Sequence, residues 1–303
     1  KSIENDVEIE RTVRFVEDAF AGVRMKDITK QMYQKVLNEL GKNRTTATVR
    51  KYHIYMKLCL KEALAEGIIY RDPTIEVTVE GKRKSKEEEL KYLNYEESQK
   101  LIAEIKRNLQ PRYMSRYIIL FALATGCRFS EIIGLTWNNV DLKNKKVTIK
   151  QTWDYKYMNE FSNTKSYASK RVVTIDDDTI KLLKELKVNQ SKQALKSGLG
   201  DKYNPHNLVF INNRMELISN NAVNKTLKSL CDKLGLKEIT FHALRHTHAS
   251  ILLYKNVNIK YISKRLGHSD VSMTYKVYSH IIDEMEQMEN RAVDNIMKDL
   301  FNV

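Results

Sequence analysis

Cysteine, proline and glycine are all scarce in this 303-residue chain. Its three cysteines, Cys59, Cys127 and Cys231, are far apart and form no C-x-x-C pair. Their number and spacing argue against a disulfide framework and against a cysteine zinc site, and they are typical of a reducing cytoplasm. With only 3 prolines and 10 glycines, the chain contains few helix breakers. We therefore expect a mostly helical protein.

The chain also lacks a long apolar segment. Its longest apolar run, YIILFALA at 117–124, is too short to span a bilayer. The first ten residues, KSIENDVEIE, do not have the pattern of a signal peptide. We therefore expect a cytoplasmic protein with no membrane partner. Because the chain does not begin with Met, we also expect that an upstream segment has been removed.

Acidic residues are outnumbered by basic ones. The chain has 52 Lys and Arg against 38 Asp and Glu, a net charge of +14, which favours a nucleic acid partner over a basic protein without one. The stretch 42–61 contains no acidic residue. A row of positive charges on a predicted helix can neutralise phosphates. The predicted DNA contacts in this stretch are Lys42, Arg44, Arg50, Lys51 and Lys57.

The spacing of apolar residues indicates two domains. Residues 8–80 are predicted to be helical, including a helix over 45–67 that ends at Gly67. The segment GKRKSKEEE at 81–89 contains no apolar residue and cannot pack in a core. We therefore predict a helical domain at 1–80, a linker at 81–90 and a second domain at 91–303.

The second domain has a mixed pattern. Helices are predicted at 94–108, with Asn94 as N-cap, at 113–126 and 128–137, and again from 177 and from 219. Short β-branched runs at 145–150, 170–175 and 207–211 predict the strands of a small sheet, and another strand with a long polar loop is expected between the first two. The expected fold class is mainly α with a small β-sheet (α+β).

Three short segments contain side chains that could act on a phosphate. In ATGCRFSEIIGL (124–135), Arg128 begins a helix, where free N–H groups favour an anion, and Glu131 lies on the same helix face and could orient a basic group. An ordinary capped helix explains the same residues. In FHALRHTHAS (241–250), His242 and Arg245 share a helix face and could both contact one phosphate.

A zinc site in the second segment is less well supported. His242 and His246 have the i, i+4 spacing of metalloprotease histidines, but Ala243 occupies the place of the glutamate base and no acidic residue is near. The third segment, RLGHSDVSMTYKVYSH (265–280), has His268 after a helix break and Tyr278 ten residues later.

Together these motifs resemble the tyrosine recombinases, or phage-type integrases, over residues 5–300. The matching elements are T-G-x-R-x-S-E at 125–131, H-x-x-R at 242–245, L-G-H at 266–268 and a following tyrosine, Tyr278. The resemblance implies a helical core-binding domain followed by a catalytic domain with helices around a small antiparallel sheet. It also implies a site-specific recombinase that cuts one DNA strand at a time without metal or cofactor.

The resemblance assigns a role to each motif residue. Tyr278 is the implied nucleophile, which forms a 3′-phosphotyrosine. The catalytic side chains that meet the negative charge of the transition state are Arg128, His242, Arg245 and His268. Glu131 is the implied supporting acid. A hairpin at 163–175, in which Arg171 opens the return strand, resembles the one that carries the general-acid lysine. Lys165 is the first choice for this lysine and Lys170 the second.

Tyr275 is not the implied nucleophile, because it follows His268 by only seven residues. Its helical spacing relative to Val271 and Tyr278 predicts a packing residue instead.

The resemblance further implies the assembly and its partners. Two domains close as a clamp on duplex DNA, and a homotetramer exchanges strands through a Holliday junction, with accessory excision and DNA-bending proteins. The subtype expected is the integrase of a bacterial phage or conjugative transposon, acting at the nucleoid. The amphipathic tail at 281–301 is expected to dock on a neighbouring protomer or to pack on its own domain. The alternatives are a type IB topoisomerase-like enzyme and a non-catalytic architectural DNA-binding protein.

Overall fold

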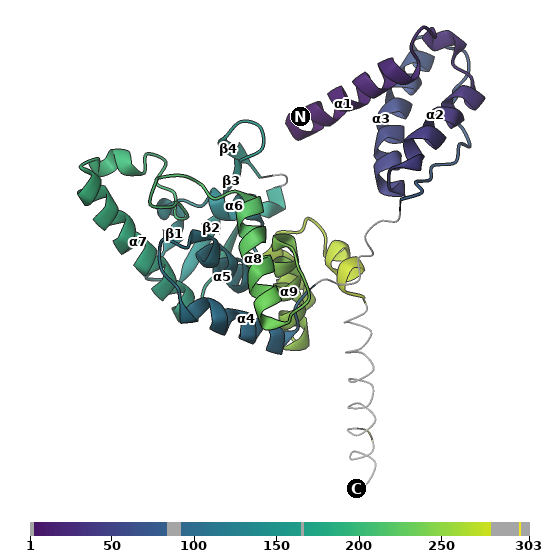
Figure 1. The fold of residues 1–303 in the computed structure, drawn as a ribbon. Helices are drawn as coiled ribbons and strands as arrows, with labels where there is room; N and C mark the ends of the chain where they lie inside the picture. The colour runs from purple at the N-terminus through teal and green to yellow at the C-terminus, as the bar shows by residue number, and fades with distance from the viewer. Residues whose placement is uncertain (1–2, 84–91, 165–166, 280–296, 298–303) are drawn as a thin grey trace. The chain divides into compact units, whose positions relative to one another are not determined.

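The computed structural model describes residues 3–83, 92–164, 167–279 and 297 (Figure 1). The chain divides into two compact units, Lys1–Leu90 and Lys91–Val303, hereafter the N-terminal and C-terminal units. Each unit has its own hydrophobic core. Each is therefore described by itself.

The N-terminal unit is helical. Its elements are α1 (Ile3–Ala19), the 3₁₀ turn η1 (Met25–Asp27), α2 (Lys30–Lys42) and α3 (Thr46–Ala65). Threonine side chains start α2 and α3, because Thr29 accepts a hydrogen bond from the Met32 amide and Thr45 from the Thr48 amide. Both α1 and α2 pack against α3. The fully buried side chains include those of Tyr33, Leu37 and Val49.

The C-terminal unit is built around one apolar helix. Its longer helices are α4 (Tyr95–Arg107), α5 (Met114–Thr125), α7 (Asp177–Ser197), α8 (Asn220–Leu234), α9 (Phe241–Tyr254) and α10 (Ile259–Leu266). Helix α5 is buried along most of its length and packs against α7, α8 and α9. The predicted cap of α4 is confirmed, since Asn94 and Glu97 exchange reciprocal side-chain and backbone hydrogen bonds.

Shorter elements complete the unit. They are α6 (Phe129–Ile133) and the 3₁₀ turns η2 (Trp137–Asn139), η3 (Tyr167–Ser169) and η4 (Gly200–Tyr203). Residues 271–279, here called the tyrosine helix, follow α10. Helix α6 is shorter than the segment predicted at 128–137, because the chain turns at Gly134. A Cβ there would lie 2.7 Å from the Trp153 nitrogen.

Two small antiparallel sheets lie in the same unit. The strands β1 (Val140–Asp141), β2 (Lys146–Ile149) and β5 (Arg171–Thr174) form one sheet in the order β1-β2-β5. The strands β3 (Gln151–Asp154) and β4 (Glu160–Asn163) form a hairpin. In the larger sheet Val147 is opposite Val173, and both side chains are buried. A mostly helical fold with small antiparallel sheets confirms the expected fold class.

The predicted strand at 207–211 is wrong. This segment makes only isolated bridges, between Thr136 and Leu208 and between Ile211 and Leu217. The apolar run arises from burial in the core, because all four side chains from Leu208 to Ile211 are buried. Burial and strand pairing favour the same residue types, so a short apolar run cannot separate them.

Among the described residues, no helix combines the length and the apolar character needed to cross a bilayer.

Candidate active site

The first site residue, Arg128, is positioned by the junction between α5 and α6. Helix α5 ends at Gly126, which adopts the left-handed conformation with φ of 67°. A Cβ at this position would lie 2.7 Å from the His248 ring and 2.8 Å from Leu266, so only glycine fits. Arg128 then occupies the N-cap of α6, as predicted, with its side chain 34% exposed.

Glu131 joins two arginines in the interior. Its side chain is 1% exposed and accepts bonds from Arg128 at 2.9 Å and from Arg171 at 2.8 Å and 3.0 Å. Burial raises the pKa of Glu131, but the bonds and charge of Arg171, together with Arg128, outweigh it and hold that pKa below its ordinary value. The charged carboxylate therefore orients Arg128, as the spacing suggested.

Arg171 is more important to this arrangement than the sequence indicated. Its guanidinium is almost fully buried and also donates to the backbone oxygens of Ser169 at 3.0 Å and Arg265 at 2.6 Å. These contacts tie the start of β5 to α6 and to the end of α10. Because every one of these partners is an acceptor, Arg171 is a fixed charge that supports Glu131.

Arg245 lies in the middle of the site on α9. Its side chain is buried and donates to the backbone oxygens of Gly126 at 2.8 Å and Leu266 at 2.7 Å. Among the described residues, no carboxylate forms an ion pair with it. Burial, with the charge of Arg128, lowers the pKa of Arg245 to about 10, so the guanidinium stays charged at neutral pH. A buried cation without an acidic partner is suited to bind an oxyanion.

The histidines have different positions. His242, at the start of α9, keeps part of its surface in solvent, while His246 is half-buried one turn later, with ring centroids 5.1 Å apart. His248 is buried and structural, since it is bonded to the Leu123 carbonyl at 2.7 Å and to Arg265 at 3.0 Å. His268 follows α10 and contacts the Thr274 hydroxyl at 2.7 Å.

The pKa values of the site histidines respond to arginines from other segments, so these segments lie close together in the fold. Burial lowers the pKa of His268 to about 4, and the charges of Arg245 and Arg128 add to this effect. Partial burial of its ring and the same two arginines also lower the pKa of His242. The predicted residues of three motifs thus share one site, in which the histidines are neutral at pH 7.

Tyr278 completes the site from the tyrosine helix. Its side chain is 1% exposed, and its hydroxyl lies 2.9 Å from Nδ1 of His246. Burial raises the pKa of Tyr278, and the charge of Arg245 acts in the opposite direction. The phenol is therefore protonated at neutral pH.

The predicted packing role of Tyr275 is wrong. Its side chain is 48% exposed. The buried positions of the tyrosine helix are Thr274 and Tyr278, at i and i+4. Because Tyr275 lies one residue beyond Thr274, helical geometry turns it toward solvent.

The general-acid lysine stays a prediction. Lys165 lies outside the described residues. Lys170 is described and exposed, directly before β5 and Arg171. Within the described part of the chain, no contact joins Lys170 to the site residues. The structure therefore does not distinguish Lys165 from Lys170 as the general acid.

The predicted DNA contacts of the N-terminal unit are all exposed, and the fold pairs two of them with acids. Lys42 pairs with Glu39 at 2.6 Å and Lys51 with Glu8 at 3.0 Å. The other three, Arg44, Arg50 and Lys57, have no ion pair among the described residues. Arg50 and Lys57 are seven residues apart on α3, so they share one helix face.

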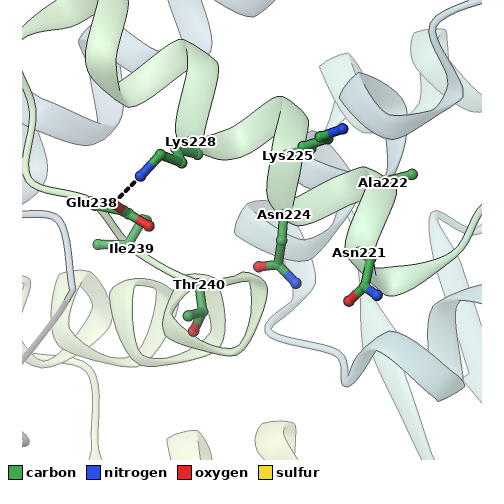
Figure 2. Close-up of a pocket in the computed structure, with 8 residues that line it drawn as sticks. All are labelled: Asn221, Ala222, Asn224, Lys225, Lys228, Glu238, Ile239 and Thr240. Carbon is green, nitrogen blue, oxygen red and sulfur yellow. Dashed lines mark hydrogen bonds and ion pairs between the residues drawn. The ribbon is translucent and has the colours of Figure 1, made fainter. Parts of the chain in front are cut away.

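A recess of about 560 Å³ lies beside the start of α9 (Figure 2). It is lined by Asn221, Ala222, Asn224, Lys225, Lys228, Glu238, Ile239 and Thr240. Figure 2 shows Lys228 and Glu238 directed at each other as an ion pair. Asn224 accepts a hydrogen bond from the Phe241 amide and so caps α9. The recess contains none of the predicted catalytic residues.

A metal site and the C-terminal tail were also considered in the sequence. Among the described residues, no group of three His, Cys, Asp or Glu side chains could hold a metal ion. The tail predicted to dock at 281–301 lies outside the described residues, apart from position 297.

Three residues in contact with the site were assigned no role in it from the sequence: Arg171, His246 and Thr274. His246 was visible as part of the histidine cluster but received no role. Thr274 is one helical turn before Tyr278, a spacing that could have suggested a shared face. Arg171 was expected only to open a strand, and its role beside Glu131 gave no local signal, because the two residues are 40 positions apart.

Comparison with known proteins identifies similar chains. The model of the phage integrase family matches residues 91–285. The chain is 29% identical over 295 residues to a tyrosine recombinase XerC-like protein of Caldanaerobacter subterraneus subsp. tengcongensis, covering 91% of this chain and 72% of that protein. It is also 29% identical over 287 residues to the integrase of Staphylococcus phage L54a, covering 89% of this chain and 80% of that integrase.

Solved structures show the same fold. The Tn1549 transposon integrase in complex with transposon right end DNA aligns with a TM-score of 0.75 and 17% identity, over 96% of this chain and 95% of that one. The XerH site-specific recombinase bound to palindromic difH substrate aligns with a TM-score of 0.70 and 19% identity, over 95% and 80%.

Proposed function

The chain belongs to the phage integrase family, and we propose that it is a site-specific DNA recombinase in which Tyr278 is the nucleophile. The observation that carries this proposal is the position of the buried Tyr278 hydroxyl beside Arg245, a buried cation without an acidic partner among the described residues. A phosphodiester bound by Arg245 would bring its phosphorus close to the tyrosine. Attack by the phenolic oxygen, with release of the phenolic proton to solvent, breaks the bond between phosphorus and the 5′-oxygen and leaves a 3′-phosphotyrosine.

The positive groups of the site match the charge that develops in this reaction. Negative charge gathers on the non-bridging oxygens of the pentacoordinate phosphorus. Arg245 and Arg128 provide fixed positive charge, the first held by two carbonyls and the second by Glu131. Such preorganised donors stabilise a transition state without rearrangement during the reaction. His242 and His268, which are neutral at pH 7, donate hydrogen bonds to the same oxygens.

The 5′-oxygen that leaves needs a proton. We assign this step to a lysine of the segment before β5, with Lys165 as the first choice and Lys170 as the second. Rejoining is the reverse reaction, in which a 5′-hydroxyl attacks the phosphotyrosine and gives its proton back to the lysine, while the departing Tyr278 oxygen takes up a proton from solvent.

DNA binding is proposed to involve both units. Arg44, Arg50 and Lys57 are exposed and available to phosphates, whereas Lys42 and Lys51 already have acidic partners. The functional assembly is proposed to be a homotetramer on paired DNA sites in the bacterial cytoplasm, at the nucleoid, with accessory excision and bending proteins.

Integration or excision of a mobile element is the favoured biological role. The similar proteins include the integrase of Staphylococcus phage L54a and the ICEBs1 integrase of Bacillus subtilis. Relaxation of DNA alone and a purely architectural role are not favoured, because the relatives are recombinases and integrases.

The experiment that tests the proposal captures covalent DNA. Purified protein is incubated with genomic DNA of its source organism and denatured in SDS, and DNA attached to protein is collected and sequenced. We expect a few discrete cut sites with protein on the 3′ end. Tyr278→Phe should abolish adduct formation, a loss of at least about 10⁴-fold, because the nucleophilic oxygen is missing.

Tyr275 provides the matched control on the same helix. Tyr275→Phe should form adduct at the wild-type rate, since this ring is exposed to solvent. Both variants should bind DNA as well as the wild-type protein in a gel-shift assay. Adduct formed by Tyr278→Phe, or its loss in Tyr275→Phe alone, would refute the assignment.

A further inference from the structure

A single hydrogen bond determines the direction of the Tyr278 hydroxyl. The ring packs in an apolar cluster with Ala249, Leu253, Ile262 and Leu266, from α9 and α10. These contacts restrain the ring but cannot fix the torsion of its O–H bond. Within the described part of the chain, the hydroxyl has one hydrogen-bond partner, Nδ1 of His246, at 2.9 Å.

The chemistry of the two groups gives this bond a direction. A buried phenol with one partner donates a hydrogen bond to it, because an unsatisfied buried donor destabilises the folded protein. Nδ1 of His246 is then the acceptor, and the ring proton must lie on Nε2. This tautomer requires a neutral imidazole.

The surroundings of His246 keep it neutral. His242 and Arg245 face it from α9, Tyr278 from the tyrosine helix and His268 from the segment after α10. Burial of the ring, with His242 and Arg245, lowers the pKa of His246 to about 4. Since burial also raises the pKa of Tyr278, the proton stays on the tyrosine in the free protein. The contact is therefore a neutral hydrogen bond and not an ion pair.

We propose that His246 is the positioning residue of the nucleophile: its Nδ1 accepts a hydrogen bond from the Tyr278 hydroxyl and so aims the phenolic oxygen for attack. With the proton directed at His246, a lone pair of the oxygen is held away from the imidazole and open to the phosphorus. The role rests on the proposed function of Tyr278. It is one of orientation, with no bond made or broken at His246.

Substitutions at position 246 can separate orientation from packing. Asparagine places an amide oxygen close to the position of Nδ1 and can accept the bond, whereas glutamine reaches toward the position of Nε2. Alanine removes the acceptor. The experiment compares the wild-type protein with H246N, H246Q and H246A. The substrate is the duplex recovered by covalent capture. The rate of adduct formation is measured in a single turnover, and DNA affinity is measured separately.

The expected result is a loss of rate without a loss of binding. H246A and H246Q should form adduct about 10- to 100-fold more slowly, because misdirection of a reacting group costs up to about 100-fold. H246N should remain within about 5-fold of wild type. All four proteins should bind the duplex equally well. Equal rates for H246A and wild type, or an H246N as slow as H246A, would overturn the positioning role.

Nuclear magnetic resonance of the imidazole nitrogens tests the same bond without DNA or substitution of His246. The wild-type protein should show His246 as the neutral tautomer with its proton on Nε2, and its Nδ1 signal should shift in Tyr278→Phe. A proton on Nδ1 at pH 7 contradicts the proposal. If the wild-type protein forms no adduct with any DNA, the proposed function itself fails, which the spectrum distinguishes from failure of the positioning role.

Discussion

The chain presents positive charge in two different ways. On α3 of the N-terminal unit, Arg50 and Lys57 are exposed and have no acidic partner among the described residues. In the C-terminal unit, Arg171 and Arg245 are buried, and each guanidinium is held by fixed acceptors. Exposed charges attract a polyanion through their number and are screened by salt. Buried charges act on a bound group through the fixed position of each guanidinium.

The cost of losing a group differs accordingly. Removing one partner of a buried pair leaves an uncompensated charge in the interior, which destabilises by about 3–5 kcal/mol. Removing one partner of an exposed pair costs about 0–1 kcal/mol. We therefore expect single changes at the buried charged residues of the C-terminal unit to destabilise it strongly, and single changes at the exposed charged residues of the N-terminal unit to have little effect.

Glu131→Gln tests this difference between buried and exposed charges, and we expect it to have the largest effect on stability. It should lower the free energy of unfolding of the C-terminal unit by about 3–5 kcal/mol, because Arg171 loses its buried carboxylate. Both tryptophans, Trp137 and Trp153, are in this unit, so their fluorescence during urea unfolding reports it.

Glu8→Gln is the matched control in the N-terminal unit, since Glu8 pairs with two exposed cations, Lys51 and Arg11. It should change stability by less than about 1 kcal/mol, measured by hydrogen exchange of the α3 amides. Equal losses for the two substitutions would contradict the distinction between the units.

The second prediction compares two glycines that both have a positive φ. Gly67 has open space where a Cβ would lie, whereas a Cβ at Gly126 would collide with His248 and Leu266. Gly67→Ala should lower the free energy of unfolding by about 1–2 kcal/mol, from backbone strain alone. Gly126→Ala should cost at least about 3 kcal/mol, because overpacking is added to the strain.

The site should respond to the same two substitutions. Gly126 also supplies a carbonyl to Arg245, so Gly126→Ala should slow adduct formation, and Gly67→Ala should not. Unfolding followed by hydrogen exchange measures both units at once. The comparison fails if Gly67→Ala is as costly as Gly126→Ala.

The smallest effect concerns the exposed charges. The double substitution of Arg50 and Lys57 by alanine should weaken binding to the captured duplex. It should also reduce the slope of log K against log salt by about 2, because two phosphates are no longer neutralised. Lys51→Ala should reduce the slope by less than about 1, because this lysine is already paired with Glu8. Titrations at several salt concentrations measure the slope. An unchanged slope in the double variant excludes α3 as a DNA-binding helix.

Local sequence was sufficient to predict the elements whose causes are local. The cap of α4 by Asn94, the break at Gly126 and the start of α7 at Asp177 follow from residues within a few positions of each other. The strand predicted at 207–211 was wrong because burial alone explains its apolar side chains. The order and spacing of four motifs were enough to indicate the family.

Contacts between distant segments could be determined only from the tertiary structure. The bond between Glu131 and Arg171 spans 40 positions, and the one between His246 and Tyr278 spans 32. Likewise, Glu8, the acid that pairs with Lys51, lies on α1, far from the basic stretch in sequence. The sequence determined which chemical groups this protein carries. Folding decided which of them are buried, paired or aimed, because burial and pairing depend on side chains brought together from distant parts of the chain.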